Sequence, residues 1–307
     1  MRKAGRFLLL MLFLIVGMAA QAEGLKFGAS YMTMNNPYFV AMNNTIKEKI
    51  EIQGDYLVTL DPALDQQKQI DQIHEFIDMG VAAIFLNPVD WQGITPALAA
   101  CHSAGIPVIV VDAPVYAEEY VTCTIVSDNL SAGQLCGEDM LRRLDGGNVV
   151  ILEHPTAKSG LDRIQNFEKI IEQHSEFTIV ARGNSDGQLD IAMRVMERIL
   201  QTHDDIGVVM CLNDPTAVGA VAALLSENEM DDDLLVYGID GSPDAKQLVA
   251  EGLLTATVAQ FPRSIANTAV ETAYDVLAGE TVEKTILIPV HLITAESINN
   301  YSLEGWQ

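Results

Sequence analysis

The sequence predicts an α/β protein built from two lobes, each a doubly wound parallel sheet. Short β-branched runs alternate with amphipathic stretches of helical length from residue 26 nearly to the end, and this alternation is typical of parallel sheets flanked by helices. About 285 residues remain after a predicted signal segment, which exceeds the usual size of one hydrophobic core. No low-complexity linker divides the chain, so strands or loops should cross between the lobes.

Ten segments carry the strand pattern, which is too many for one compact lobe of this length. The expected strands are residues 26–32, 56–60, 82–86, 108–111, 121–127, 149–153, 178–182, 207–211, 234–238 and 255–259. Residues 120–130 suggest a crossing between lobes, and Pro289 with the apolar run after it suggests a late crossing back. We therefore expect an N-terminal lobe of residues 25–126 plus 261–289 and a C-terminal lobe of residues 127–260 plus 290–307.

The first 22 residues predict export through a cleavable signal peptide. Arg2, Lys3 and Arg6 precede an apolar run, and Ala20-Gln21-Ala22 follows it, which is the pattern of a secretory signal. The apolar run is too short for a transmembrane helix. The first cysteine is Cys101, so no cysteine stands at the cleavage point for a lipid anchor. Residues 1–22 should be removed and the remaining chain released into the periplasm.

Strong acidity excludes some partners. The chain has 18 basic and 42 acidic residues. Loss of residues 1–22, which hold three basic and no acidic residues, changes the formal charge from −24 to −27. Such a chain would be repelled by nucleic acid and by anionic membrane surfaces. The acidity can serve solubility, a basic docking surface on a membrane partner, or both.

The four cysteines predict neither a metal site nor a required disulfide. Cys101, Cys123, Cys136 and Cys211 lie within expected helices or strands, and no pair has metal-ligand spacing. An oxidising compartment permits disulfides, so pairing stays open, but buried small hydrophobic residues are the favoured interpretation. No metal or other cofactor is expected.

Planar polar side chains follow five of the expected strands. They are Asn36, Asn87, Asp112, the pair Asn213 and Asp214, and Asp240. Each could be an ordinary helix cap, but ligands also bind beyond the carboxyl ends of parallel strands. The adjacent aromatic residues Tyr38 and Phe39 could cover the apolar face of a sugar ring, while amides and carboxylates bind hydroxyl groups. This set suits a neutral polyhydroxy ligand.

Several short motifs carry a family resemblance in order and spacing across the chain. They are NNPYFV at 35–40, FLNPVD at 85–90, PVIVVDA at 107–113, SDN at 127–129, NDPTAVGA at 213–220, YGIDGSPD at 237–244 and TVAQFP at 257–262. In these motifs the chain resembles the ribose-binding-protein branch of the type I periplasmic sugar-binding family.

The resemblance implies two lobes joined by a three-segment hinge, which close on a sugar or polyol and deliver it to an ABC transporter permease in the membrane. The ligand contacts that it implies are Asn36, Tyr38, Phe39, Asn87, Asp112, Arg163, Asn213, Asp240 and Gln260. The motif around Arg163 keeps Phe167 but has Asn166 where the family pattern has glycine.

Two departures from the ribose binders predict a larger or differently shaped pocket. Ala113 stands where a charged donor would follow Asp112, and Gly187 aligns with an aromatic residue. Trp91 and His154 lie near expected strand ends and could fill the space, although neither is counted as a site residue. Ribose is therefore less favoured, and pentose, hexose, branched sugar, inositol and linear polyol stay open.

Other functions have less support. Asp112 and Asp240 could in principle act as an acid-base pair, but no nucleophile elbow, phosphate loop or histidine pair at metal spacing accompanies them, so no enzyme and no catalytic residue is expected. A DNA-binding regulator of similar fold would begin with a basic helix-turn-helix. A monomer is expected, and docking on a chemoreceptor or a sensor histidine kinase stays open as an alternative.

Overall fold

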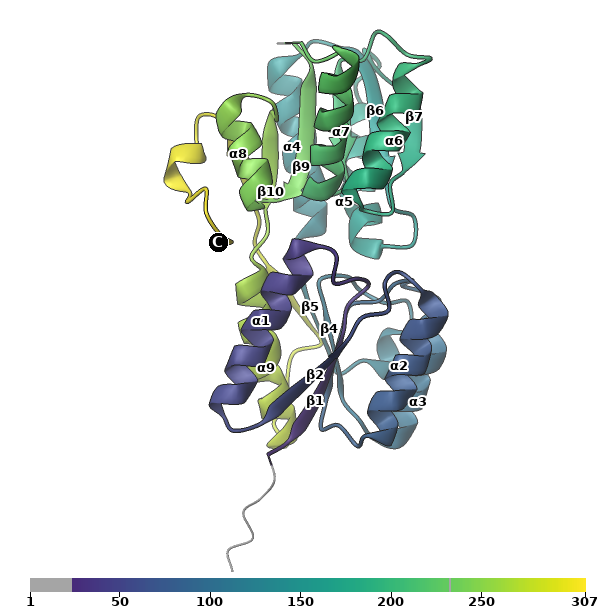
Figure 1. Ribbon diagram of the computed structural model, residues 1–307, viewed down its shortest axis with the longest axis vertical. Helices are drawn as coiled ribbons and strands as arrows, with labels where there is room; N and C mark the ends of the chain where they lie inside the picture. Colours follow the sequence, from purple (N-terminus) through teal and green to yellow (C-terminus); the bar gives the residue numbers. More distant parts are fainter. Residues whose placement is uncertain (1–23, 232) are drawn as a thin grey trace, which may run out of the picture.

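The computed structural model describes residues 24–231 and 233–307 and shows two α/β lobes stacked along the long axis of the molecule (Figure 1). The predicted signal peptide at residues 1–22 lies outside the described residues. Each lobe contains one six-stranded sheet with helices on both faces. The prediction of two doubly wound lobes is confirmed.

The first sheet is parallel throughout, with the strand order β11-β5-β4-β3-β1-β2. Its strands are β1 (Lys26–Ser30), β2 (Tyr56–Leu60), β3 (Ile84–Leu86), β4 (Val108–Val111), β5 (Cys123–Ser127) and β11 (Thr285–Ile288). Its helices are α1 (Pro37–Ile52), α2 (Gln66–Asp78), α3 (Thr95–Ala104) and α9 (Pro262–Leu277), with the 3₁₀ helix η1 (Glu118–Tyr120). Figure 1 shows α1 and α9 on one face and α2 and α3 on the other.

The second sheet has the order β12-β10-β9-β8-β6-β7 and is parallel except where β12 pairs with β10. Its strands are β6 (Gly147–Glu153), β7 (Phe177–Asn184), β8 (Val208–Cys211), β9 (Leu235–Asp240), β10 (Ala256–Ala259) and β12 (His291–Thr294). Its helices are α4 (Asn129–Arg143), α5 (Lys158–Ile171), α6 (Leu189–Leu200), α7 (Asp214–Glu227) and α8 (Pro243–Glu251), with the 3₁₀ helix η2 (Ile298–Asn300).

Strands buried on both faces explain the unbroken apolar runs in the sequence. In β4, Ile109 and Val111 pack in the core that contains α1 and α9, whereas Val108 and Val110 pack in the core that contains α2 and α3. Successive strand residues point to opposite faces, so a sheet covered by helices on both sides requires every residue of such a strand to be apolar.

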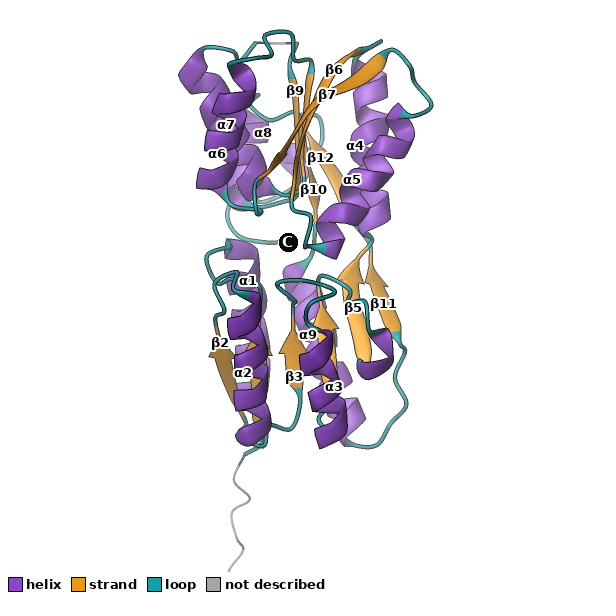
Figure 2. Ribbon diagram, turned by 90° about the vertical axis from the view of Figure 1, so that its right-hand side faces the viewer, coloured by secondary structure: helices purple, strands orange, loops and turns teal. Residues whose placement is uncertain are grey.

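All ten expected strands are present, and β11 and β12 are two further strands that the sequence pattern did not predict. They flank Pro289 and carry part of the late crossing. The mutually parallel strands of each sheet, all except β12, point toward the space between the lobes (Figure 2). The segment after β11 enters the second lobe from this space and therefore runs opposite to the parallel strands there. For this reason β12 pairs antiparallel with β10.

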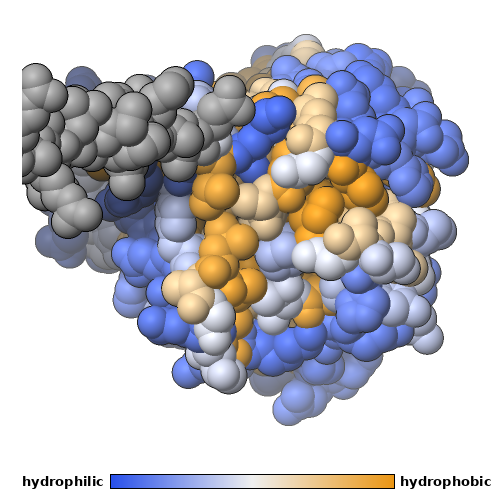
Figure 3. Space-filling view, turned by 90° about the horizontal axis from the view of Figure 1, so that it is seen from below, coloured by the Kyte–Doolittle hydropathy of each residue, from blue (hydrophilic) through white to orange (hydrophobic). Residues whose placement is uncertain are grey.

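The cysteines lie in the core, while the outer end of the lower lobe exposes some apolar surface. Figure 3 views that end and shows apolar residues gathered near the middle of the face, with hydrophilic residues around them. No helix in the described ranges combines the length and apolarity needed to cross a membrane. Cys101, Cys123, Cys136 and Cys211 are all buried and free, which confirms the interpretation as small core residues.

Helices α4 and α5 approach each other closely at a glycine. A Cβ atom on Gly133 would lie 1.9 Å from the carbonyl oxygen of Arg163, so only a residue without a side chain fits between the two backbones. Gly137, one turn later, would similarly place a Cβ 2.8 Å from Ile170. This contact fixes the position of α5 and, with it, the starting point of the Arg163 side chain.

We expect Gly133→Ala to destabilise the protein by about 1–3 kcal/mol, because the added methyl group must push the two helix backbones apart. Alanine has a higher intrinsic helix propensity than glycine, so a loss of stability in this variant would report the packing clash alone. Urea unfolding monitored by circular dichroism measures the change. Gly160→Ala on α5 is the matched control, since the nearest atom to its Cβ would be a side-chain methyl of Leu212 at 3.1 Å and the nearest backbone atom would lie 3.8 Å away. Equal stability of Gly133→Ala and wild type would contradict the close approach.

Candidate functional site

The polar strand ends of both sheets meet at one small cavity between the lobes. This inner cavity has a volume of about 30 Å³. Eight of the nine predicted ligand residues line it: Asn36, Tyr38, Phe39, Asp112, Arg163, Asn213, Asp240 and Gln260. The ninth, Asn87, is not among the lining residues but donates a hydrogen bond to Asp112.

The start of α1 supplies the aromatic wall of the inner cavity. Asn36 caps the helix, because its side-chain oxygen accepts from the backbone N–H of Tyr38 at 2.9 Å, and Pro37 occupies the first helical turn as is common there. The capping bond uses the oxygen, so the amide nitrogen of Asn36 is the group that can donate into the cavity. Tyr38 and Phe39 are buried and pack edge to face at 5.5 Å.

Asp112 follows β4 and is held by its neighbours. Asn87 donates from Nδ2 to Asp112 Oδ2 at 3.0 Å, and the Asp112 backbone has a φ of 66°, a conformation that costs a non-glycine residue free energy. Burial raises the pKa of Asp112, while the Arg163 guanidinium opposes the shift. Asn87 therefore acts as a positioning residue for this carboxyl group.

Arg163 brings a buried positive charge to the cavity from α5. Its side chain is 3% exposed. Nε donates to Asn129 Oδ1 at 2.8 Å, Nη1 donates to the carbonyl oxygen of Leu212 at 2.9 Å, and Nη1 lies 3.9 Å from Asp240 Oδ1. These contacts fix the guanidinium plane, and the five N–H groups of an arginine leave capacity for further acceptors.

Asp240, at the end of β9, carries the least satisfied polar group of the cavity. Gln260 donates from Nε2 to Asp240 Oδ1 at 2.7 Å, and Tyr38 donates its hydroxyl to Gln260 Oε1 at 3.3 Å. Asp240 Oδ2 is buried and has no hydrogen-bond partner within the described part of the chain. Burial and the nearby Asp214 raise the pKa of Asp240 well above its usual range. Its φ of 152° adds backbone strain at a second carboxylate.

Five further polar residues that were not counted among the predicted site residues also line the inner cavity: Thr33, His154, Ser159, Asp186 and Gln188. Burial lowers the pKa of His154, so its imidazole is neutral near pH 7. Thr33 and Asp186 each follow a strand by a few residues, which is the signal that could have identified them. His154, which the sequence placed near a strand end without counting it as a site residue, directly follows β6.

The structure also places the two positions at which the chain departs from ribose binders. Gly187 lines the inner cavity with a φ of +66°, and a Cβ there would lie 3.1 Å from Asn213 Nδ2. Asn213 in turn donates to the Gly187 carbonyl at 3.2 Å, so a side chain at this position would crowd Asn213. Trp91 lies outside this cavity and packs edge to face against Tyr116 at 5.9 Å.

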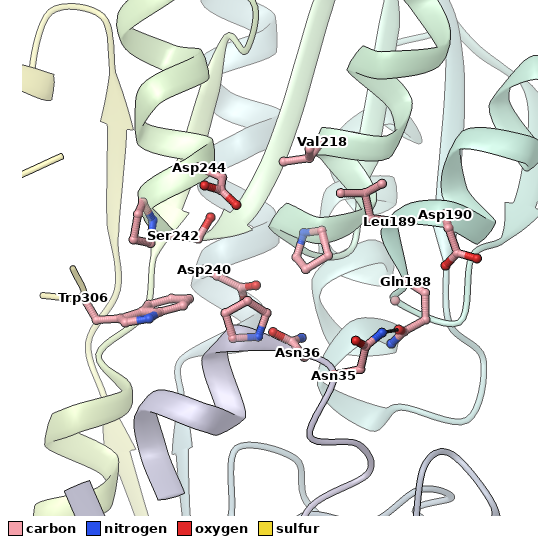
Figure 4. A pocket seen from close by; sticks show the side chains of 14 residues that line it. Asn35, Asn36, Gln188, Leu189, Asp190, Val218, Asp240, Ser242, Asp244 and Trp306 are labelled. Carbon is pink, nitrogen blue, oxygen red and sulfur yellow. Dashed lines mark hydrogen bonds between the residues drawn. The ribbon is translucent and has the colours of Figure 1, made fainter. Parts of the chain in front are cut away.

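A second, larger cavity lies beside the first. This outer cavity has a volume of about 570 Å³ and shares Asn36, Gly187, Gln188 and Asp240 with the inner one (Figure 4). Direct contacts join the lobes next to it, because Asn35 Nδ2 donates to Gln188 Oε1 at 2.8 Å. The lobes are thus in contact around the inner cavity.

The chemistry of the two cavities favours hydrogen bonding to a ligand. Hydroxyl, amide, carboxyl and guanidinium groups converge on the inner cavity beside two aromatic rings, which is the combination that encloses a hydroxyl-rich molecule. In the described ranges, no group of three or more His, Cys, Asp or Glu side chains is arranged to hold a metal ion.

Asp214, behind the inner cavity, gives the protein a pH dependence that can be measured. It accepts from Thr257 Oγ1 and from the Ser242 backbone N–H, both at 2.7 Å. Burial raises its pKa from 3.8 to about 6. The folded state therefore binds more protons than the unfolded state between these two values, and this contribution to stability is present at low pH and lost as the pH rises through about 6.

We expect the stability of the wild type relative to Asp214→Asn to decrease between about pH 4 and pH 6, because the asparagine does not titrate. Urea unfolding of both proteins at several pH values measures the free energy of unfolding of each. A difference between the two that stays constant, or that grows with pH, would contradict the raised pKa.

Comparison with known proteins places the chain in a family. Residues 27–281 match the periplasmic binding protein domain. A ribose import binding protein of Bacillus subtilis is 34% identical over 270 residues, which are 87% of this chain and 86% of the relative.

Two solved structures have the same architecture. An ABC transporter solute-binding protein from Bacillus halodurans with bound myo-inositol is 28% identical, with a TM-score of 0.85 and coverage of 92% of this chain and 98% of that one. A solute-binding protein from Mycobacterium smegmatis with bound glycerol is 31% identical, with a TM-score of 0.84 and coverage of 90% and 96%. The chain belongs to the periplasmic binding proteins, and its two α/β lobes are those of type I.

Proposed function

We propose that this protein is the periplasmic substrate-binding component of an ABC-type sugar importer. It captures a monosaccharide or polyol in the inner cavity and delivers it to a membrane permease, without a chemical step. The inner cavity carries this proposal, because side chains from both sheets converge there on one buried volume.

The unsatisfied Asp240 Oδ2 is the single observation that supports the proposal most. A buried carboxylate oxygen without a hydrogen-bond donor costs free energy, and a ligand hydroxyl would satisfy it. Two strained aspartate backbones, at Asp112 and Asp240, add to this argument because such strain is concentrated at functional sites. The carboxyl oxygens of Asp112 and Asp240 accept hydroxyl protons, whereas Arg163 and Asn36 donate hydrogen bonds.

Capture would proceed by hinge closure. Tyr38 and Asp112 belong to the first sheet and its helices, while Arg163 and Asp240 belong to the second, so a ligand can bind all four only when the lobes approach. Ligand binding would then shift the population toward the closed form that the permease recognises. The moving bodies in this proposal are residues 25–126 plus 261–289 and residues 127–260 plus 290–307.

The ligand class rests on the cavity and on the relatives together. The relatives and neighbours named above bind ribose, myo-inositol and glycerol, which share hydroxyl groups on a compact carbon skeleton. Ala113 is fully buried in this chain and offers no charge, so the ligand would find its positive partner in Arg163 alone among the predicted contacts.

A thermal-shift screen over pentoses, hexoses, branched sugars, inositols and linear polyols should identify the ligand. At a concentration of 100 times the dissociation constant, a bound ligand adds about 2.7 kcal/mol to stability, and the melting temperature rises accordingly. Amino acids of similar size are the control compounds. Stabilisation by an amino acid and by no hydroxyl-rich compound would overturn the proposed ligand class.

Substitutions at the two charged partners should weaken binding of the identified ligand. Hydrogen bonds to charged groups contribute about 1.5–3 kcal/mol, so Arg163→Ala and Asp240→Asn should each raise the dissociation constant about tenfold or more in calorimetric titrations. Arg182→Ala is the matched control, because Arg182 is exposed and pairs with Glu153 and Glu168 at the far edge of the sheet. Unchanged affinity of both site variants would refute the assignment of the inner cavity.

The permease is the proposed membrane partner, and docking of the loaded protein on a chemoreceptor or sensor kinase is the alternative. Pull-down of the detergent-solubilised proteins with the ligand-saturated monomer distinguishes them. We expect the ligand-bound protein to retain the permease and the ligand-free protein not to retain it. Retention of a receptor alone would replace the transport role with a sensory one.

A further inference from the structure

Residues 302–307 form a strap that runs from the second lobe toward the cavities, and the end of the chain lies beside the space between the lobes (Figure 1). Lys246 on α8 anchors the strap. Its side chain is almost fully buried at 1% exposure, and Nζ donates to the carbonyl oxygens of Ser302 at 2.6 Å and Gly305 at 2.9 Å and to Gln307 Oε1 at 3.3 Å. A buried ammonium with three acceptors holds this segment in one conformation.

The end of the strap is bonded to the backbone of the inner site. Gln307 Nε2 donates to the carbonyl oxygen of Asp240 at 3.2 Å and to that of Gln260 at 2.8 Å. Gly241 makes the approach possible, because a Cβ at this position would lie 2.3 Å from Gln307 Nε2. The strap is thus packed against two of the predicted ligand residues.

Trp306 is the side chain that this anchoring presents to the outer cavity. Its ring lies 5.6 Å from the Tyr38 ring at an interplanar angle of 76°, so it also contacts the first lobe. Figure 4 shows Trp306 on one side of the outer cavity and Gln188 and Asp190 on the other. The indole therefore forms a wall of that cavity and a link between the two lobes.

The outer cavity resembles a binding site in its chemistry. Pro37, Leu189, Pro215 and Val218 supply apolar surface, and Asp244 and the shared Asp240 supply acceptors. A half-buried tryptophan beside carboxylates and amides is suited to a second ring that has an apolar face and hydroxyl edges. Asp240, whose Oδ2 is buried without a partner in the described ranges, lines both cavities and marks the place where they join.

We propose that the outer cavity is a second subsite, and that the ligand is a two-unit compound: a sugar or polyol joined to a further sugar ring that packs on Trp306. This inference rests on the proposed function, since the first unit occupies the inner cavity. It predicts that a glycoside binds more tightly than the single unit it contains. It also makes Trp306 a specificity-determining residue.

Calorimetric titrations with matched pairs of compounds test the subsite. Ribose, galactose, myo-inositol and glycerol are the single units, and ribosides, lactose, melibiose, galactosyl-myo-inositol and galactosylglycerol are the extended probes. We expect at least one extended probe to bind about tenfold or more tightly than its single unit, as one further stacked ring provides. If a single unit binds and every extended form of it binds equally or more weakly, the subsite is refuted while the proposed function stands. If none of these compounds binds and the wider thermal-shift screen also finds no hydroxyl-rich ligand, both fail.

Variants separate the strap from the inner cavity. Trp306→Ala should reduce the ratio of extended to single-unit affinity by about threefold or more. Lys246→Met should do the same by releasing the strap, and thermal unfolding checks that this variant is folded. Trp91→Ala is the matched control, because Trp91 lines neither cavity, and it should leave the ratio unchanged. An unchanged ratio in Trp306→Ala would overturn the role of the indole.

Fluorescence gives an independent measurement, since Trp91 and Trp306 are the two tryptophans of the sequence. In Trp91→Phe, emission reports on Trp306 alone. An extended probe should shift this emission to shorter wavelength by more than its single unit does, because the second ring excludes water from the indole. Equal shifts with both members of a pair would show that lobe closure alone changes the surroundings of Trp306 and would refute the subsite.

Discussion

A buried guanidinium that faces two buried carboxylates is the interaction on which the site depends. Burial disfavours the charged forms of Asp112 and Asp240 and raises the pKa of both acids. The arrangement is tolerated because Asn87, Gln260 and neighbouring backbone atoms hydrogen-bond to part of each group. Other atoms, above all Asp240 Oδ2, lack a hydrogen-bond donor in the described part of the chain, and in the proposed function a ligand hydroxyl would supply it.

Strand direction brings these groups together. Both sheets direct the carboxyl ends of their mutually parallel strands toward the space between the lobes (Figure 2), so the residues after β4 and at the end of β9 meet although they are far apart in sequence. The close contact of α4 with α5 at Gly133 adds Arg163 from a helix. Packing of the two cores therefore determines the geometry of the site.

The strap at 302–307 adds a cavity wall that does not come from the sheets. The inner cavity is built from strand ends and helix starts, which cannot vary without disturbing a core. Trp306, by contrast, is held by one buried lysine and a few backbone hydrogen bonds. In the proposed arrangement the sheets would provide general recognition of hydroxyl groups, and the strap would adjust which larger ligands are preferred.

The sequence by itself determined the number and order of the main strands, the two-lobed α/β class and eight of the residues that line the inner cavity. Fully buried strands impose continuous apolar runs, and polar residues just after such strands fall at a known edge of the sheet. Arg163 and Gln260 followed only from the family resemblance. It did not predict β11 and β12, since short edge strands beside Pro289 bury few residues and leave little periodicity to detect.

Only the tertiary structure decided the rest. His154 and Gln188 belong to the cavity because the second lobe turns them toward it, and Asn87 lies behind Asp112 because β3 and β4 are neighbours in the sheet. Trp306 reaches the outer cavity through contacts with residues distant in sequence. Lys246 holds the strap, and the Tyr38 ring packs against the indole. Periodicity and motifs report on neighbours along the chain, whereas the volume and reach of a cavity are set by how separate elements pack.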